Sequence, residues 1–580
     1  MLLSNTMQKL TMLLVLLSTS AFAQEVPPLF VRDAVGVKSY ASAPRLAERL
    51  AIEPAVILGA AREVVPEEIE AITRWNAEGR EPAKIGFTRR IPNGVPVRVG
   101  GESATAGRGA RVSSATSVIW SGAIQVKGAH RLRLHLANVQ LPANATLWVS
   151  GAGEPATGFG NELADANGEL YTPSISGETA YIEVEVPSGE SASFDIIDVV
   201  ELVAPKTPAA LDAPTCLIDS SCVPTSTLAQ IASFRHAIAH LEYMKNGSSF
   251  VCSGTLLNDA DESTTVPYLL TANHCFSTQT SASTLEAFFD YYTATCNGTF
   301  PAISSKPKSS GATLLATNAA PGSDFTFVRL NSMPSGRSLL GWNANTAVAA
   351  PGTTIYRLSH PFPDQFTQPA PQFFSTTTVV NPSSTCSGIP VSSFLYSTSA
   401  SGGIYGGSSG GAAFTSSGQV VGQLLGTCGP TPDDGCNAAN RAVDGAFSAT
   451  FPFIQQYVNT TSTAACTPSA TLLCLNNDRF AVKVDWKRSG GETGQGQGIK
   501  YTANSGLFWF FADDNIELIV KILTGCPLSN TYWVFAAATT NVEYTLTVTD
   551  TKNGKVKTYL NPQGVSAAAI TDTNAFATCP

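Results

Sequence analysis

The distribution of cysteine constrains this chain more than any other feature of its sequence. All twelve cysteines lie from Cys216 onward, whereas residues 24–212 contain none. An even number of cysteines in an exported chain predicts disulfide bonds. No two of them have the C-x-x-C spacing of a structural zinc site, so we expect no bound metal. The chain therefore divides near residue 213 into a cysteine-free part and a disulfide-bonded part.

The first 23 residues predict export from the cytoplasm. Lys9 provides a positive charge, residues 10–17 form a short apolar core, and residues 21–23 have the A-x-A form of a cleavage site. That core is too short to span a bilayer, and no later apolar run is long enough either. The formal net charge is −9 and there is no basic stripe, which argues against a nucleic-acid partner. We therefore expect a secreted protein with neither a membrane nor a nucleic-acid partner.

Residues 24–212 predict a β-sandwich preceded by helices. Residues 45–72 have helical periodicity, whereas residues 131–136 and 181–186 alternate as half-buried strands do. The Pro-rich stretch 203–214 that follows has the composition of a linker.

Two further β-rich units follow the linker, which makes the expected fold class mostly β. The first covers residues 213–462. The second, residues 463–580, consists of apolar runs separated by turns and predicts a small antiparallel β domain. It contains no histidine, and we expect only structural roles for its cysteines Cys466, Cys474, Cys526 and Cys579.

Residues 402–414 are rich in glycine and serine and precede an alternating apolar strand at 419–425. Glycine permits positive φ angles and a close approach by a substrate. A serine hydroxyl is a poor nucleophile until a neighbouring base takes its proton. The stretch predicts either a nucleophile loop whose N–H groups form an oxyanion hole, or an ordinary Gly/Ser-rich turn.

His274 and Asp324 stand at the ends of two expected strands. A Cys252–Cys275 disulfide between neighbouring strands would hold His274 rigidly at a strand end. Asp324 opens the apolar strand 325–330, where a buried carboxylate needs a hydrogen bond that an imidazole N–H could supply. Taken alone, Asp324 is more readily interpreted as a turn residue before a strand.

The remaining histidines give weaker signals. His236 and His240 have the i,i+4 spacing of two metal ligands on a helix. The metalloprotease motif, however, requires a glutamate directly after the first histidine, and that position is Ala237. Structural roles are therefore favoured for both. His130 and His135 fit solvent-facing positions on strands.

Four segments in a fixed order resemble the trypsin-like serine proteases of chymotrypsin fold: CSGTLL, LLTANHC, SDFTFVRL and GGSSGGAAF. Thr215–Asp219 and Leu358–Pro361 are similar to segments of secreted bacterial lysyl endopeptidases, and residues 24–212 resemble the propeptides of that group. The resemblance implies a double β-barrel protease domain over 213–462. Residues 463–580 are similar to a β domain appended to many secreted bacterial proteins.

The resemblance also implies roles for individual residues. Ser409 would be the nucleophile, His274 the general base and acid, and Asp324 the group that orients the imidazole. The N–H groups of Gly407 and Ser409 would form the oxyanion hole. The strand edge expected to pair with an extended peptide substrate consists of Leu425, Gly426 and Thr427.

Two positions depart from the trypsin pattern. Trypsin-type enzymes have an aspartate directly before the nucleophile to bind a new N-terminus, but this chain has Ser408. We therefore expect activation by removal of the propeptide. The residues at the expected pocket floor, Gly403 and Ile404, include no acid, which predicts small or medium aliphatic P1 residues.

A rival prediction for specificity comes from the resemblance itself. Lysyl endopeptidases supply a pocket acid from a loop after the nucleophile. The candidates in that loop are Asp433, Asp434 and Asp444. Asp444 is the nearest of them, although Arg441 could pair with it instead.

The function expected from these features is that of a secreted serine endopeptidase. Its partners would be protein or peptide substrates and its own propeptide, and it would need no cofactor. The alternative is a non-catalytic adhesion or binding protein on a retired protease scaffold. Retired proteases usually lose one catalytic residue, whereas this chain has all three, which favours the enzyme.

Overall fold

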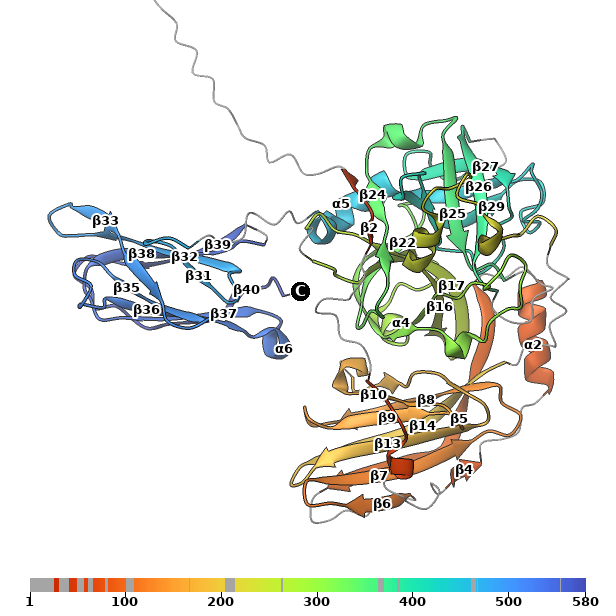
Figure 1. Ribbon diagram of the computed structural model, residues 1–580, viewed down its shortest axis with the longest axis horizontal. Coiled ribbons are helices and arrows are strands. Elements are labelled where there is room, and N and C mark those ends of the chain that lie inside the picture. Colours follow the sequence, from red (N-terminus) through yellow and green to blue (C-terminus); the bar gives the residue numbers. More distant parts are fainter. Residues whose placement is uncertain are drawn as a thin grey trace, which may run out of the picture.

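The protein is mostly β, as the sequence predicts, and Figure 1 shows its sheets. The computed structural model describes residues 25–30, 41–49, 57–60, 66–78, 82–100, 109–165, 167–203, 214–261, 264–362, 370–382, 386, 388–459, 466, 468–552 and 554–579. The expected signal segment and most of the expected linker lie outside these residues. No helix within the described ranges is both long and apolar enough to cross a bilayer.

The cysteine-free part forms the expected β-sandwich, here called the N-terminal sandwich. Its first sheet has the order β3 (Ala41–Ala43), β10 (Ala156–Phe159), β9 (Thr146–Ser150), β13 (Thr179–Pro187), β7 (Ser117–Gln125) and β4 (Ile57–Ala60), with β6 (Ala110–Ser113) also on β7. Its second has the order β11 (Leu170–Tyr171), β8 (Arg131–Gln140), β14 (Ser191–Leu202) and β5 (Ala83–Gly100), with β12 (Ile175–Ser176) also on β8 and η1 (Asn161–Leu163) nearby. Trp120 and Phe194, one from each sheet, meet edge to face with ring centroids 6.1 Å apart. Alternating apolar residues of both sheets thus form one core.

The helical region expected over residues 45–72 is only partly helical. The structure has α1 (Leu46–Arg49) and α2 (Pro66–Ala77), but β4 lies between them and pairs in parallel with β7. Residues 50–56 and 61–65 lie outside the described part of the chain. Proline lacks the N–H that a continuous helix needs, and Pro66 stands at the start of α2, where this is tolerated.

The cysteine-bearing part contains two β-barrels. In the first, the strands pair around a ring that closes because β20 leads through Gly311 directly into β21. Around that ring they are β16 (Ile238–Lys245), β17 (Ser248–Leu257), β18 (Tyr268–Ala272), β22 (Phe325–Leu330), β21 (Ala312–Asn318), β20 (Lys308–Ser310) and β19 (Glu286–Phe289). The short helices beside it are η2 (Ser220–Cys222), α3 (Ile231–Phe234), η3 (Arg235–Ala237), α4 (Gln279–Ser283) and η4 (Ile303–Ser305).

The second barrel closes because one strand, β29, pairs with both β28 and β30. Its ring consists of β29 (Gln419–Cys428), β28 (Ala412–Phe414), β25 (Thr354–Ser359), β26 (Phe373–Val380), β27 (Phe394–Ser401) and β30 (Arg441–Ala446). Outside the ring lie β15 (Ile218–Asp219), β23 (Ser338–Leu339), β24 (Gly341–Asn343), η5 (Thr346–Ala349) and α5 (Phe447–Val458). The disulfides of the two barrels are Cys216–Cys436, Cys222–Cys296, Cys252–Cys275 and Cys386–Cys428. The expected Cys252–Cys275 pairing is therefore confirmed, as is the double β-barrel.

The N-terminal sandwich and the first barrel share one sheet. Strand β5 pairs antiparallel with β17, with Ser248 opposite Phe87 and Val251 opposite Ala83. In Figure 1, β5 can be followed from the sandwich to the edge of the barrel. Buried ion pairs reinforce this junction, since both guanidinium nitrogens of Arg131 donate to Glu242 at 2.9 Å.

The last part is a second sandwich. One sheet contains β31 (Leu473–Leu475), β32 (Phe480–Lys487), β38 (Glu543–Asp550) and β39 (Lys555–Asn561), with β33 (Thr493–Gln495) on β32. The other contains β34 (Gln497–Lys500), β35 (Ser505–Trp509), β36 (Leu518–Thr524), β37 (Tyr532–Ala538) and β40 (Ile570–Phe576), with α6 (Cys526–Ser529) before β37. Its disulfides are Cys466–Cys474 and Cys526–Cys579.

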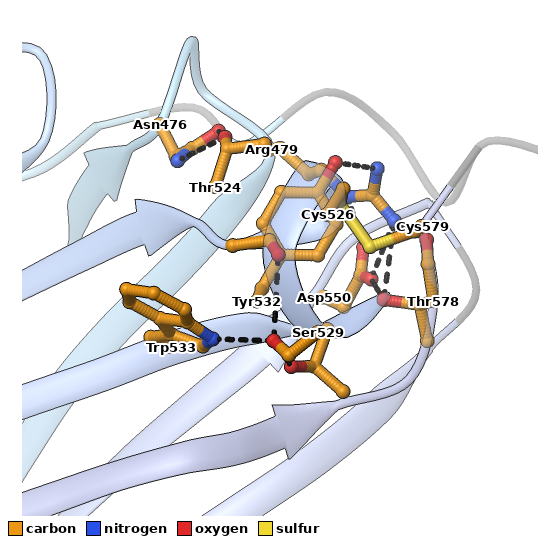
Figure 2. The surroundings of a disulfide bond; sticks show 12 residues. Asn476, Arg479, Thr524, Cys526, Ser529, Tyr532, Trp533, Asp550, Thr578 and Cys579 are labelled. Atoms are coloured by element: carbon orange, nitrogen blue, oxygen red, sulfur yellow. Dashed lines mark hydrogen bonds and ion pairs between the residues drawn. A yellow bond between two sulfur atoms is a disulfide. The ribbon is translucent and has the colours of Figure 1, made fainter. Parts of the chain in front are cut away.

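One end of this sandwich is closed by a disulfide and a buried ion pair. Figure 2 shows Arg479 beside the Cys526–Cys579 bond, donating to Asp550 at 2.8 Å and to the Tyr532 hydroxyl at 2.7 Å. Thr578, next to Cys579, accepts a further hydrogen bond from Arg479 through its carbonyl oxygen at 2.6 Å. These cysteines and polar groups tie the C-terminal residues to the sheets, which is a structural role.

Candidate active site

The register between β18 and β22 brings His274 next to Asp324. These strands are antiparallel, with Thr271 opposite Thr326 and Ala272 opposite Phe325. Continuing that register by one residue puts Asn273 opposite Asp324, and the Asn273 N–H donates to the Asp324 carbonyl at 3.0 Å. His274 is therefore the first side chain beyond the end of the ladder, directly above the aspartate.

Asp324 holds His274 through both of its carboxylate oxygens. Oδ2 lies 2.7 Å from the imidazole Nδ1, and Oδ1 accepts the His274 backbone N–H at 3.0 Å. The carboxylate is almost fully buried, whereas about a quarter of the histidine side chain is exposed. Lys245 braces the same turn because its ammonium group donates to the carbonyl oxygens of His274 and Cys275, at 2.9 and 3.2 Å. One ring edge is thus fixed by the aspartate while the ring still reaches the surface.

Asp324 itself lies where the two barrels meet. Its φ is +52°, a left-handed conformation that aspartate tolerates better than most residues. The preceding carbonyl, that of Ser323, accepts a hydrogen bond of 2.6 Å from Gln423 of β29. A Cβ at Gly445 would lie 1.8 Å from the same carbonyl oxygen, so only glycine fits there. The second barrel therefore fixes the aspartate that the first barrel presents to the histidine.

The Ser409 loop docks directly beside His274. The Ser409 carbonyl accepts the N–H of Ser253 at 2.8 Å and lies 3.9 Å from the Cys275 sulfur. Cys275 is the neighbour of His274 in sequence, and a ring nitrogen of His274 lies within 4.8 Å of the Cys252 and Cys275 sulfurs. The structure thus brings His274, Asp324 and Ser409 to one place at the junction of the barrels.

That group of His274 with two cysteines is the one cluster in the described residues whose atoms are close enough to share an ion. Both sulfurs belong to the Cys252–Cys275 disulfide, so they cannot act as thiolate ligands.

The backbone conformation and close packing of the Ser409 loop require glycine at two positions, 407 and 410. Gly407 has φ +87°, and a Cβ there would approach the His360 carbonyl to 2.7 Å. Its carbonyl accepts a hydrogen bond of 2.8 Å from the Ser253 hydroxyl. Among the described residues, no acceptor faces the Gly407 N–H. Gly410, with φ +78°, packs so tightly on Thr271 and Ser253 that no side chain fits.

Ser408 is fully buried and accepts a hydrogen bond of 3.1 Å from the Ser359 hydroxyl. A neutral serine pair thus occupies the place where trypsin-type enzymes are expected to hold an aspartate and an ammonium group. No charge is present in this pair for a new N-terminus to neutralise.

Asp444, the nearest candidate for a pocket acid, is occupied elsewhere. It is completely buried, and both its carboxylate oxygens accept from one Arg357 nitrogen, at 2.7 and 2.9 Å. Burial raises the pKa of Asp444, and the Arg357 charge opposes that shift. Arg357 also donates to the Gly411 carbonyl at 2.6 Å. The expectation that Asp444 meets a substrate is therefore wrong, and so is the alternative pairing with Arg441, because a residue 87 positions earlier supplies the partner.

The other two acids of that loop point to solvent. Asp433 and Asp434 are exposed, and the Asp434 carboxylate accepts the Cys436 N–H at 3.0 Å in a tight turn. Neither is positioned as a buried counter-charge.

Ile404 lies in a small apolar cluster with Leu424 and Ala442. All three side chains are buried, and they come from the Ser409 loop, β29 and β30. Gly403 also packs against a disulfide. A Cβ at Gly403 would lie 2.5 Å from the Cys216 sulfur, so glycine is required for packing against the Cys216–Cys436 disulfide.

The expected substrate-pairing edge belongs to β29. Gly426 and Thr427 pair with Val443 and Ala442 of β30, and the register shifts at Leu425. On the other side of β29, the pairings with β28 and β24 extend only from Gln419 to Gln423. In the part of the chain that the structure describes, the second edge of residues 425–427 therefore has no strand on it.

The other histidines are structural. His236 lies in η3 and its Nδ1 is 2.7 Å from Asp290, whereas His240 lies in β16 beside Glu242. They share no helix, so the i,i+4 metal interpretation fails. His130 is exposed, as expected, but His135 is not. His135 is half-buried between Asp198, at 2.9 Å, and Glu169, and its ring stacks on Tyr171.

Sequence reasoning missed two residues that organise the site. Ser253 lies on β17, and its hydroxyl donates to the Gly407 carbonyl and accepts the His360 N–H. Arg357 is a buried charge on β25 that supports the loop of Ser409 through Gly411. An arginine inside a predicted strand was the clearest available signal, but the partners of Ser253 and Arg357 lie 154 and 54 residues away.

Two solved structures are similar to part of the chain. One is HL collagenase, with 14% identity and a TM-score of 0.28, covering 38% of this chain and 93% of that one. The other is the thermostable serine protease AL20 from an extremophilic microorganism, with 17% identity and a TM-score of 0.28, covering 39% and 98%.

Sequence comparisons match two consecutive parts of the chain. A family model described as the lysyl endopeptidase N-terminal domain matches residues 58–202, and one described as the lysyl endopeptidase C-terminal domain matches residues 211–440. The lysyl endopeptidase of Pseudomonas aeruginosa is 25% identical over 259 residues, which cover 42% of this chain and 54% of that relative. The aligned region thus spans about half the relative's length. The chain belongs to the lysyl endopeptidase-like family, whose N-terminal and C-terminal domains it carries in that order.

Proposed function

We propose that this protein is a secreted serine endopeptidase that cleaves peptide bonds through an acyl-enzyme on Ser409. The contact that carries the proposal is the paired hydrogen bonding of Asp324 to the ring and backbone of His274, beside the docked Ser409 loop. Such a carboxylate fixes the tautomer with the proton on Nδ1. Nε2 is then the basic nitrogen that can accept a proton from a serine hydroxyl.

The reaction follows from these roles. Ser409 Oγ adds to the scissile carbonyl carbon as its proton moves to His274 Nε2, and Asp324 stabilises the resulting imidazolium. The N–H groups of Gly407 and Ser409 receive the developing oxyanion, each worth about 3–4 kcal/mol in comparable sites. The tetrahedral intermediate collapses when His274 gives that proton to the leaving amine. Water, activated by His274 in the same way, then hydrolyses the acyl-enzyme and restores the serine.

We expect the substrate to bind as an added strand on Leu425–Thr427, because one edge of these residues has no partner strand in the described part of the chain. The P1 side chain would meet Ile404, Leu424 and Ala442, since these apolar side chains cluster beside the Ser409 loop. A lysine in such surroundings would need a buried acid, and Asp444 is committed to Arg357. The preferred P1 residue is therefore small or medium aliphatic, unlike the substrate that the family name implies.

Residues 24–212 would act as a propeptide that assists folding and blocks the enzyme until it is removed. The family match to an N-terminal domain over 58–202 and the sheet shared through β5 and β17 support this role. The disulfides of the barrels, which persist only in an oxidising compartment, support secretion.

An organophosphonate that carries a mass tag tests the nucleophile. We expect one covalent adduct per active chain, located by peptide mapping on Ser409, and none on the Ser409→Ala variant. Ser417→Ala changes an exposed serine on the next turn and serves as the matched control that keeps labelling. Normal labelling of Ser409→Ala would overturn the assignment.

A further inference from the structure

A short segment far from the rest of the N-terminal sandwich lies on the second barrel. Strands β1 (Glu25–Val26) and β2 (Leu29–Phe30) pair antiparallel with β24 and β23, respectively. We call residues 25–30 the strap. In Figure 1, β2 lies beside β24 at the left edge of the barrels, above the strands of the sandwich.

The strap is built into the barrel rather than resting on it. Val26 is 4% exposed and belongs to the same apolar core as Leu340 and Trp342. A Cβ at Gly341 would lie 2.1 Å from the Val26 carbonyl oxygen, so the barrel strand has glycine where the strap crosses it. This close approach indicates a fitted peptide-binding groove along β23 and β24.

Polar and aromatic contacts fix the strap along its length. The amide of Asn258 donates to the Pro27 carbonyl at 3.0 Å, and the amide of Asn343 donates to the Glu25 carboxylate at 2.8 Å. At the other end, the Phe30 ring stacks on Phe234 with centroids 6.4 Å apart. The groove therefore recognises an extended segment with an acid at its first position, buried valine at its second and an aromatic at its last.

The N-terminal sandwich binds the first barrel at a separate surface. There β5 adds to β17, and Arg131 and Arg133 face Glu242 and Glu286 of the barrel, all four side chains being buried. Lys308 completes the cluster by pairing with Glu286 at 3.0 Å. These contacts do not involve β23 or β24.

We propose that the propeptide is a bivalent ligand of the protease barrels, held by the strap at one site and by the sandwich at the other. A cut in the 203–214 linker separates neither site from its partner. With one site bound, rebinding at the other is intramolecular, which raises the overall affinity by roughly 10²–10⁴ over one contact alone. The strap, rather than the linker, therefore sets how long the cleaved propeptide stays on the enzyme.

The test measures dissociation without relying on catalysis. This inference rests on the proposed role of residues 24–212. The test protein carries Ser409→Ala, so that it cannot cut itself, and the recognition sequence of an added protease replaces its residues 205–213. After complete cutting and dilution, native mass spectrometry follows the fraction of barrels that still carry the propeptide. Absence of phosphonate labelling from the chain that retains Ser409 would overturn the catalytic assignment and leave this measurement unchanged.

The strap variants are Val26→Asp, which places a charge in the core, and Phe30→Ala, which removes a ring that is 42% exposed. In this background, we expect the two fragments with the native strap to stay together. Val26→Asp should release the propeptide on the order of 10²-fold faster than the native strap, and Phe30→Ala several-fold faster. Val112→Asp, on the exposed strand β6, is the control and keeps the wild-type rate.

A synthetic peptide of residues 24–30, added in excess to the cut wild-type complex, should accelerate release by competing for the groove. Phe30→Ala and this peptide carry the test if Val26→Asp does not fold. The proposal would be wrong if Phe30→Ala and the peptide-treated complex released the propeptide no faster than the Val112→Asp control.

Discussion

At the scale of single residues, the site depends on charges that never meet substrate. Arg357 and Asp444 form a buried ion pair inside the second barrel, in which one guanidinium nitrogen contacts both carboxylate oxygens. Another nitrogen of the same guanidinium donates to the Gly411 carbonyl in the loop that carries Ser409. Removing one member of such a pair leaves the other charge buried without compensation. Asp444 therefore supports the loop and its stability, and we propose that the aliphatic cluster around Ile404 meets the P1 side chain.

We predict that Asp444→Asn destabilises the protein by about 3–5 kcal/mol without changing its P1 preference. Denaturant unfolding measures the first effect, and cleavage of a proteome-derived peptide library measures the second. Asp433→Asn, at an exposed position of the same loop, should change neither. Strict Lys or Arg at P1 in the parent, abolished by Asp444→Asn, would contradict the aliphatic pocket.

At the scale of elements, the carboxylate of Asp290 joins two segments that are distant in sequence, one containing His236 and the other Arg337. Asp290 follows β19 and contacts His236 of η3 at 2.7 Å and Arg337, just before β23, at 2.9 Å. Burial opposes ionisation of Asp290, but the hydrogen bonds from His236 and Arg337 outweigh it and lower its pKa to about 2. A carboxyl whose pKa is depressed on folding stabilises the protein at neutral pH and loses that contribution as the pH falls through the folded value.

We predict that Asp290→Asn lowers the melting temperature at pH 6 and that its difference from wild type shrinks as the pH falls from about 4 to about 2. Thermal melts over a pH series measure this, with Asp433→Asn as an exposed control. A difference that stays constant down to pH 2 would contradict the assigned ion pairs.

At the scale of the whole molecule, the N-terminal and C-terminal sandwiches each have a core of their own, whereas one large apolar cluster includes side chains of both barrels. The continuous sheet through β5 and β17 joins the N-terminal sandwich to the first barrel, and the Pro-rich stretch 203–214 is where we propose that the chain is cut. The proposed propeptide could therefore template the first barrel and still be separated afterwards.

We predict that the active secreted form begins between about Pro205 and Cys216. Intact-mass spectrometry under denaturing conditions gives the new N-terminus, because it removes any strap peptide that is bound without a covalent link. The control is the Ser409→Ala variant, which we expect to remain uncut and inactive. An active species whose uncut polypeptide still begins at Gln24 would refute the propeptide role.

The sequence alone determined the features that are local. Each catalytic candidate lies in a short motif, and the strand ends before His274 and after Asp324 follow from the alternation of apolar residues. The Cys252–Cys275 disulfide was predictable for the same reason, since it joins neighbouring strands only 23 residues apart. The fold class, mostly β with an N-terminal sandwich, a double barrel and a small antiparallel β domain at the C-terminal end, also followed from strand patterning and from the ordered motifs.

Only the tertiary structure decided which distant groups meet. Asp444 could not be matched to Arg357, nor His135 to Asp198, because burial and strand register bring together residues that no spacing connects. Residues 45–72 contain a strand because β4 gains backbone hydrogen bonds from β7, which outweighs the helical propensity of that segment. The strap was not predictable for the same physical reason: four of its six residues form strands only by pairing with β23 and β24, more than 300 residues away.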